Sequence, residues 1–160
     1  MVPIAIGIGT SRPLRLVDYT FILPHVSCAM KKFTNKIIDM AKIYKSPTLI
    51  KASGNKEKTI EEFIGRVNSG NSEISIARMK SPEGWEEPGQ CPEFDEYTIV
   101  LNGCLKVKTM DNEYLVEASQ AILVNAKEWV QYSSPFAGGA KYIAVCLPAV
   151  SPDSVHRDNQ

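Results

Sequence analysis

With 160 residues, the chain has the length of one ordinary domain, and its 44% hydrophobic residues are enough for one buried core. Eighteen basic residues balance eighteen acidic ones, so composition gives no electrostatic reason to expect nucleic acid or an anionic membrane as a partner. The apolar run at 2–8 is shorter than the roughly 20 residues that span a bilayer. Four cysteines stand without a C-x-x-C pair, and no secretory signal precedes them. We therefore expect a cytoplasmic protein with free thiols.

The first 39 residues differ in character from the rest of the chain. They show neither clean alternation nor, over most of their length, a helical stripe, whereas Met40-Ala41-Lys42 reads like an ordinary start. Two interpretations stay open: an N-terminal extension over 1–39, disordered or produced by a misassigned start, or an ordered arm that packs on the domain. The domain itself is predicted to span 40–160.

Further along, the pattern becomes that of a β protein. The segment 59–67 is ambiguous because its apolar residues fit a short helix or a half-buried strand. Asn102-Gly103 is a strong hairpin signal. Short strands at regular spacing with turn residues between them predict an all-β sandwich or closed barrel. The predicted strands are 74–79, 97–101, 105–108, 114–116, 121–124, 129–132 and 142–147.

Two segments resemble the sequence motifs of the cupin family. Residues 89–103 are similar to the first motif, G-x5-H-x-H-x3/4-E-x6-G, because Glu96 and Gly103 have the spacing of its second half. Residues 119–134 are similar to the second motif, G-x5-P-x-G-x2-H-x3-N, with the same overall length. The resemblance covers roughly 74–147 and implies a single cupin barrel, a jelly-roll or double-stranded β-helix. Asp95-Glu96 followed by an apolar strand and Gly103 is also weakly similar to cupins of ethanolamine utilisation.

The same resemblance puts the family's metal chemistry in doubt. In the family, two histidines, a glutamate and a third histidine hold a divalent metal inside the barrel. The matching positions here are Gly89, Cys91, Glu96 and Val130, and only the glutamate is intact. Asn125-Ala126-Lys127 also replaces Pro-x-Gly in the second motif. Because His25 and His156 are the only histidines, a three-histidine site cannot be assembled; we expect no metal, and the cofactor is unknown.

Candidate site residues follow from strand alternation in the family's register. Glu96, Thr98 and Val100 would face the interior, and Tyr97, Ile99 and Leu101 would face outward. Glu93, Asp95 and Glu96 would crowd at the barrel mouth, and like charges held close raise at least one carboxyl pKa. The predicted catalytic residues are Glu93, Glu96 and Tyr132, and the predicted ligand-binding residues are Arg78, Gln90, Cys91, Thr98 and Trp129. In the alternative interpretation, Glu93 and Asp95 are solvated and Glu96 is bonded to Arg78 or a tyrosine.

Three functions stay open at this point. The first is a metal-independent cupin that binds a small polar metabolite and acts as an isomerase, epimerase or lyase. The second is a non-enzymatic ligand-binding or sensor module, and the third is a divergent metallocupin using Glu93, Glu96, Cys91 and His156. We also expect a homodimer through an outer face containing Ile99, Leu101 and Leu105, and no nucleic-acid or membrane partner. The tail 151–158 is either a mobile terminus or a segment that folds over a barrel mouth.

Overall fold

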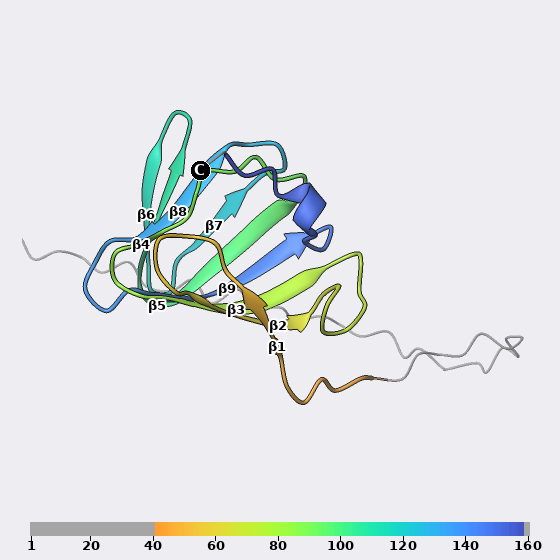
Figure 1. The fold of residues 1–160 in the computed structure, drawn as a ribbon. Helices are drawn as coiled ribbons and strands as arrows, with labels where there is room; N and C mark the ends of the chain where they lie inside the picture. Colours follow the sequence, from red (N-terminus) through yellow and green to blue (C-terminus); the bar gives the residue numbers. More distant parts are fainter. Residues whose placement is uncertain (1–40, 159–160) are drawn as a thin grey trace, which may run out of the picture. The chain divides into compact units, whose positions relative to one another are not determined.

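The computed structural model describes residues 41–158, so the predictions for 1–39 lie outside the described residues. This part of the chain contains strands and a single turn of 3-10 helix (Figure 1). The elements are β1 (Thr48–Lys51), β2 (Thr59–Ile64), β3 (Ser75–Ser81), β4 (Trp85–Glu86), β5 (Asp95–Thr109), β6 (Glu113–Glu117), β7 (Ala121–Val124), β8 (Val130–Ser134), β9 (Ala140–Leu147) and η1 (Pro152–Ser154). The all-β prediction is confirmed, and 59–67, left open by its pattern, begins with β2.

The strands form two antiparallel sheets that share β5. One sheet has the order β1-β2-β3-β9-β5-β7, and the other has the order β4-β8-β5-β6. The first half of β5 pairs with β7 and β9, and its second half pairs with β6 and β8. The sheets curl around a common interior (Figure 1). In this region of the chain, no helix has the length and apolar character needed to cross a membrane.

The hairpin prediction at Asn102-Gly103 is wrong, because β5 runs through these residues as one strand of 15 residues. Its register shifts between Val100 and Asn102, and Gly103 has a φ of 78°. A Cβ at Gly103 would overlap the backbone of Gly139, so only glycine fits. The irregularity bends the strand from one sheet into the other and changes which residues face inward. Leu105, expected on the outer face, is therefore fully buried.

The predicted register of both motifs agrees with the backbone. The second motif has glycines where this chain has Ser119 and Lys127, and these residues have φ angles of 69° and 68°. Left-handed backbone is uncommon for residues other than glycine. Together with Gly103, these positions keep the conformation for which the family pattern uses glycine. The backbone therefore matches the motifs at these positions, although Glu96 is the one ligand side chain of the motifs that is present.

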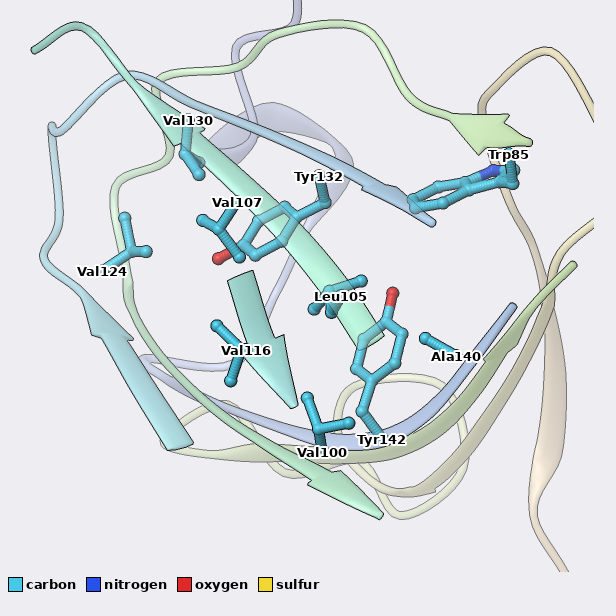
Figure 2. Packing of buried hydrophobic residues seen from close by; sticks show 10 residues of the cluster. All are labelled: Trp85, Val100, Leu105, Val107, Val116, Val124, Val130, Tyr132, Ala140 and Tyr142. Atoms are coloured by element: carbon cyan, nitrogen blue, oxygen red, sulfur yellow. The ribbon is translucent and has the colours of Figure 1, made fainter. Parts of the chain in front are cut away.

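Apolar side chains fill most of the space between the two sheets (Figure 2). The main cluster is Trp85, Val100, Leu105, Val107, Val116, Val124, Val130, Tyr132, Ala140 and Tyr142. The interior is thus a low-dielectric environment, in which charged groups interact strongly and are costly to leave unpaired.

The C-terminal segment is ordered as far as it is described. It lies antiparallel to 89–93, with backbone hydrogen bonds from Cys91 to His156 and from Glu93 to Ser154. Val155 is buried against Phe94 in a second apolar cluster. Of the two alternatives for 151–158, the structure therefore favours a segment packed against the first motif of its own barrel.

Candidate functional site

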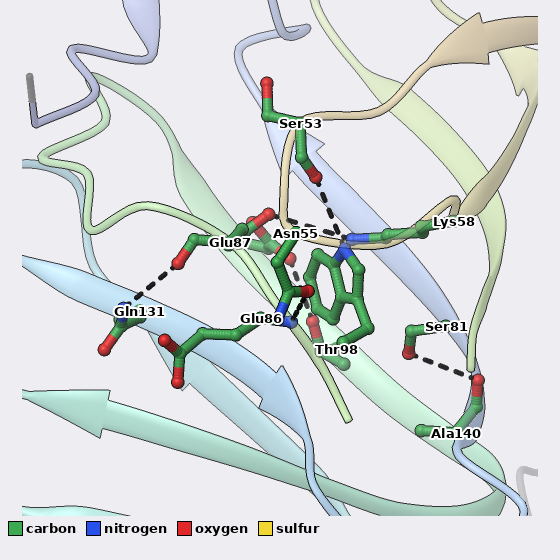
Figure 3. A network of polar contacts seen from close by, with 11 residues as sticks. Ser53, Asn55, Lys58, Ser81, Glu86, Glu87, Thr98, Gln131 and Ala140 are labelled. Atoms are coloured by element: carbon green, nitrogen blue, oxygen red, sulfur yellow. Dashed lines mark hydrogen bonds and ion pairs between the residues drawn. The ribbon is translucent and has the colours of Figure 1, made fainter. Parts of the chain in front are cut away.

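A group of buried polar side chains lies inside the barrel, and we call it the interior polar cluster. Its members come from separate segments of the chain and influence one another's charge. They are Lys58, Glu87, Glu96, Thr98, Tyr132 and Tyr142, each less than 9% exposed. Figure 3 shows Lys58, Glu87 and Thr98 in the interior.

Lys58, immediately before β2, places an ammonium group between two aromatic rings. Its Nζ lies 4.0 Å from the centre of the Trp85 ring and 5.4 Å from that of Tyr142. Among the described residues, its one carboxylate neighbour within 4 Å is Glu87, with Oε2 at 3.8 Å. Burial acts to lower the pKa of Lys58, but Tyr142, Glu87 and Glu96 outweigh it and raise this pKa above 10.5. Lys58 is thus a permanent cation inside the barrel.

Glu96, on β5, is a carboxyl group whose pKa lies close to neutral pH. Burial, and then repulsion from Glu87, raises its pKa from 4.5 to about 7, against the opposing effects of Lys58, Thr98 and Tyr132. The Thr98 hydroxyl donates a hydrogen bond of 3.1 Å to Glu96 Oε1. Near neutral pH this carboxyl can therefore either donate or accept a proton.

Glu87 and Tyr132 complete the cluster around Glu96. Burial raises the pKa of Glu87, while Lys58 and Arg157 act to lower it. The Tyr132 hydroxyl is buried and has no hydrogen-bond partner of good geometry, although it is near enough to Glu96 to favour the carboxylate form. An unsatisfied buried hydroxyl costs about 1–3 kcal/mol. Tyr132 thus places a poorly satisfied hydroxyl next to the Glu96 carboxyl.

Two pockets are each lined by one member of the Lys58–Glu87 pair. A pocket of about 550 Å³ is lined by residues of β1, the following loop and β2, including Lys58. Another of about 480 Å³ is lined by residues on both sides of Glu87, by Gln131 and by Asp158. A third, of about 600 Å³, lies between β6 and β7 and contains no member of the cluster.

Residues of the loop 52–58 line both of the first two pockets, and the loop ends with Lys58. Its Asn55 binds the segment around β4 through three hydrogen bonds of 2.9–3.1 Å, two of them with Glu86. Lys56 Nζ donates to the Glu83 carbonyl at 2.7 Å, and the Trp85 indole donates to the carbonyl of Ser53 at 3.3 Å. The loop is thus held over the cluster by polar contacts, most of which are exposed.

The positions that match the family's metal ligands do not fit a metal. Val130 has no donor atom, and a side chain at Gly89 would overlap Trp129 and Asp158. Cys91 Sγ donates to the Lys127 carbonyl at 3.3 Å. Within 41–158 no three His, Cys, Asp or Glu residues are grouped to hold a metal ion. We derive no step through a metal.

The structure brings three sequence-predicted site residues together in the interior: Glu96, Thr98 and Tyr132. It does not bring Glu93 there, because Glu93 is exposed and pairs with His156 Nε2 at 2.9 Å. The predicted crowding of Glu93 and Asp95 with Glu96 is therefore wrong; Asp95 instead accepts a hydrogen bond from the Ala126 amide. Of the divergent metal set, Cys91 and Glu93 each contact His156, but Glu96 is buried in the interior, and no three of the described His, Cys, Asp or Glu residues are placed to hold a metal ion.

The remaining predicted ligand-binding residues lie away from the cluster. Arg78 projects outward because its neighbours Ala77 and Met79 face the core, and it binds Glu61 on β2 at 2.6 and 3.0 Å rather than Glu96. Gln90 is buried and exchanges backbone hydrogen bonds with β8. Trp129 is half-buried and its indole donates to Asp158 at 3.0 Å.

Sequence reasoning missed Lys58, Glu87 and Tyr142. Tyr142 could have been found, because alternation along β9 places it on the same face as Ala144 and Cys146. Lys58 and Glu87 carry no such signal. Both lie in charged, polar segments next to short strands, and such segments are usually solvated.

No family model matches the chain. A curated protein named endoribonuclease YbeY, from Myxococcus xanthus, is 39% identical over 101 residues, which are 63% of this chain and 34% of that protein. The chain thus spans about a third of the length of this curated relative.

Solved structures share the fold at low identity. The polyketide cyclase RemF from Streptomyces resistomycificus matches with a TM-score of 0.60 and 16% identity, over 76% of this chain and 87% of that one. A double-stranded β-helix protein from Klebsiella pneumoniae matches with 0.54 and 9%, over 66% and 88%. A putative ethanolamine utilization protein Q from Salmonella typhimurium matches with 0.52 and 14%, over 65% and 97%.

These likenesses and the two curled sheets define the class: residues 41–158 form a barrel of the cupin, or double-stranded β-helix, type. Within that class, this chain is a cupin-fold protein with an ammonium and two carboxyl groups in its interior, where the matching metal-ligand positions have lost three of their four usual donors.

Proposed function

We propose that the barrel interior binds a small polar metabolite and that Glu96 exchanges a proton with it, without a metal. The observation that carries the proposal is a buried carboxyl whose pKa is about 7 beside the Tyr132 hydroxyl, which has no hydrogen-bond partner of good geometry. Perturbed carboxyl groups next to unpaired buried donors are typical of ligand sites. The cupin fold of the neighbours is compatible with this use but names no substrate.

The proton step needs no group beyond those present. With a ligand next to Glu96, its carboxylate would remove a proton from carbon beside a carbonyl, and the C–H electron pair would move onto the carbonyl oxygen. The resulting carboxylic acid would return the proton to the opposite face of the same carbon after the ligand turns, or to the former carbonyl carbon of a hydroxycarbonyl ligand, whose hydroxyl proton then moves to the other oxygen. Such a sequence is an epimerisation or isomerisation, and Tyr132 would hold the polar oxygen of the ligand in place.

Two measurements test this proposal. The first is a screen of polar metabolites by thermal shift on the wild type, Glu96→Gln and Tyr132→Phe, with the exposed Glu57→Gln as matched control. The second incubates each hit in D₂O and follows deuterium incorporation by NMR. We expect hits that stabilise the wild type and Glu57→Gln but not Tyr132→Phe, and an exchange that is lost in Glu96→Gln. Equal stabilisation of all variants would contradict the proposal.

A binding module without catalysis is the second candidate, favoured by the low exposure of the cluster. A ligand that binds through Tyr132 but exchanges no deuterium would identify it. A metal is excluded from the proposal because of the donor set, and elemental analysis of protein purified without a metal-affinity tag checks this. A stoichiometric transition metal that is lost in Glu96→Gln would contradict it.

We do not extend the endoribonuclease activity in the relative's name to this chain. The match covers only 34% of that relative. Basic and acidic residues are balanced over the whole chain, which offers no excess of positive charge for a phosphate backbone.

A further inference from the structure

We infer that the pocket between β6 and β7 is a second binding site, which takes an uncharged small molecule with an aromatic or branched alkyl body and an oxygen acceptor. None of the residues that line this pocket belongs to the interior polar cluster, so this site is additional to the one in the proposed function.

The pocket runs from the protein surface down to the core. Tyr114 and Leu115, which are 44% and 53% exposed, line its outer part. Val116 and Val124, which are 4% and 2% exposed, also line it and belong to the main apolar cluster (Figure 2). Its volume of about 600 Å³ is that of a small-molecule site. An apolar group of moderate size would therefore displace water from branched aliphatic walls, and burial of apolar surface favours binding.

The facing edges of β6 and β7 distinguish a small ligand from an added strand. In the described part of the chain each of these strands pairs only with β5, and they belong to different sheets. Hydrogen bonding alternates along an antiparallel pair, so the backbone groups of Leu115 and Leu123 point away from β5, and within 41–158 they have no partner. An added strand could pair with both edges only with a bend like that of β5, whereas a small ligand needs none.

Thr109 supplies a polar anchor in the pocket. It lines the pocket and is 6% exposed. Its hydroxyl accepts a hydrogen bond of 3.2 Å from the Asn112 amide, but its own acceptor, the Asn112 carbonyl, is 3.5 Å away. That distance exceeds the usual O–H···O range, so a ligand oxygen would be a better acceptor for this buried donor.

The charge of the lining selects against ions. Glu128 is the one charged side chain among the lining residues, and none of them is basic. A carboxylate or sulfonate would meet this acid without a compensating cation, and an ammonium would lose its water against aliphatic walls. The lining therefore favours a neutral ligand.

The probe for this site is Prodan, a neutral naphthalene ketone whose emission shifts to shorter wavelengths in apolar surroundings. We titrate it into the wild-type chain of 160 residues and map its contacts by NMR on methyl-labelled protein. We expect saturable binding, with nuclear Overhauser effects from the dye to the methyl groups of Ile122 and Val124 and none to Leu101 on the outer face. The anionic dye anilinonaphthalene sulfonate should bind about tenfold more weakly or worse.

Two variants sharpen the test. Ile122 lines the pocket and packs on the core, so Ile122→Trp should fill the space and raise the Kd of Prodan by about tenfold or more. Val67→Trp adds the same ring system at a position that is 63% exposed and should leave the Kd unchanged. Thr109→Val should raise the Kd of Prodan about two- to tenfold but not that of dimethylaminonaphthalene, which lacks the ketone.

Because Ile122→Trp can disturb the core, the NMR contacts of the wild type decide the question without it. Contacts confined to Ile99 and Leu101, absence of saturable binding, or tighter binding of the sulfonate would overturn the inference. Hydrogen exchange tests the other occupants. Slow exchange of the Leu115 and Leu123 amides in the absence of dye would show that a strand of this chain or of a second copy already covers the gap, and it would overturn the inference as well.

Discussion

Replacing Glu96 with glutamine should change the pH dependence of stability by an amount that the structure fixes. The pKa of Glu96 is 4.5 when exposed and about 7 in the folded barrel. A difference of one in pKa corresponds to about 1.4 kcal/mol, so the shift corresponds to roughly 3 kcal/mol. Between these pH values the folded state binds more protons than the unfolded chain, and stability must fall as pH rises. Glutamine imitates the protonated form and can still accept the Thr98 hydrogen bond.

The measurement is urea unfolding of both proteins between pH 4.5 and 8.5. We expect the stability of the wild type, relative to Glu96→Gln, to fall by about 3 kcal/mol across this range. Most of this loss should occur between pH 4.5 and about 7, and the difference should level off at higher pH. Glu57→Gln removes an exposed carboxylate from the loop beside Lys58 and should give a constant difference from the wild type. If the curve for Glu96→Gln runs parallel to the wild type at every pH, Glu96 is not held as an acid in the interior, and the reasoning fails.

Three further predictions follow from the packing. Lys58→Met should destabilise the fold by about 3–5 kcal/mol in urea unfolding, because it leaves the Glu87 charge buried alone. Adding Glu87→Gln to this variant should recover part of the lost stability. If the losses of the two single variants simply add, the two side chains are not paired. Gly103→Ala should lower the free energy of unfolding by about 2 kcal/mol or more in the same assay, because Gly103 has a left-handed φ and a Cβ there would overlap the backbone of Gly139. An unchanged denaturation midpoint would contradict the bend in β5. We propose a homodimer through the outer face at Leu101, which is 53% exposed: light scattering should give two chains for the wild type and one for Leu101→Lys, and one chain for both would dismiss the dimer.

Much of the fold could be predicted because it depends on local signals. Alternation identified the inward face of the first half of β5, where Glu96, Thr98 and Val100 are buried while Tyr97 and Ile99 are exposed. What failed was the turn chemistry of Asn102-Gly103. The same dipeptide fits a hairpin and a bend within a long strand, and only the partners β6 to β9 decide between them.

The site was less accessible to sequence reasoning, for a physical reason. The family pattern located Glu96, because it describes residues near one another in the chain. Lys58 is 29 residues from Glu87 and 38 residues from Glu96 in the chain, and it lies outside both motifs. Only tertiary contacts bring it to these two carboxyl groups. The outward position of Arg78, in turn, follows from its neighbours' contacts with the core rather than from its charge.

The missing metal ligands and the interior ammonium have a common electrostatic explanation. In the motifs that this chain resembles, histidines and a glutamate hold a cation inside the barrel; of these residues the chain has only the glutamate, Glu96, and a lone carboxylate is costly in a dry core. Lys58 supplies a covalently attached cation from a segment outside both motifs. One ammonium faces two carboxyl groups, Glu87 and Glu96, so the cluster cannot hold both as carboxylates without an excess negative charge. The pKa of Glu96 therefore lies at about 7, and under the proposed function this is the proton that is exchanged with the ligand.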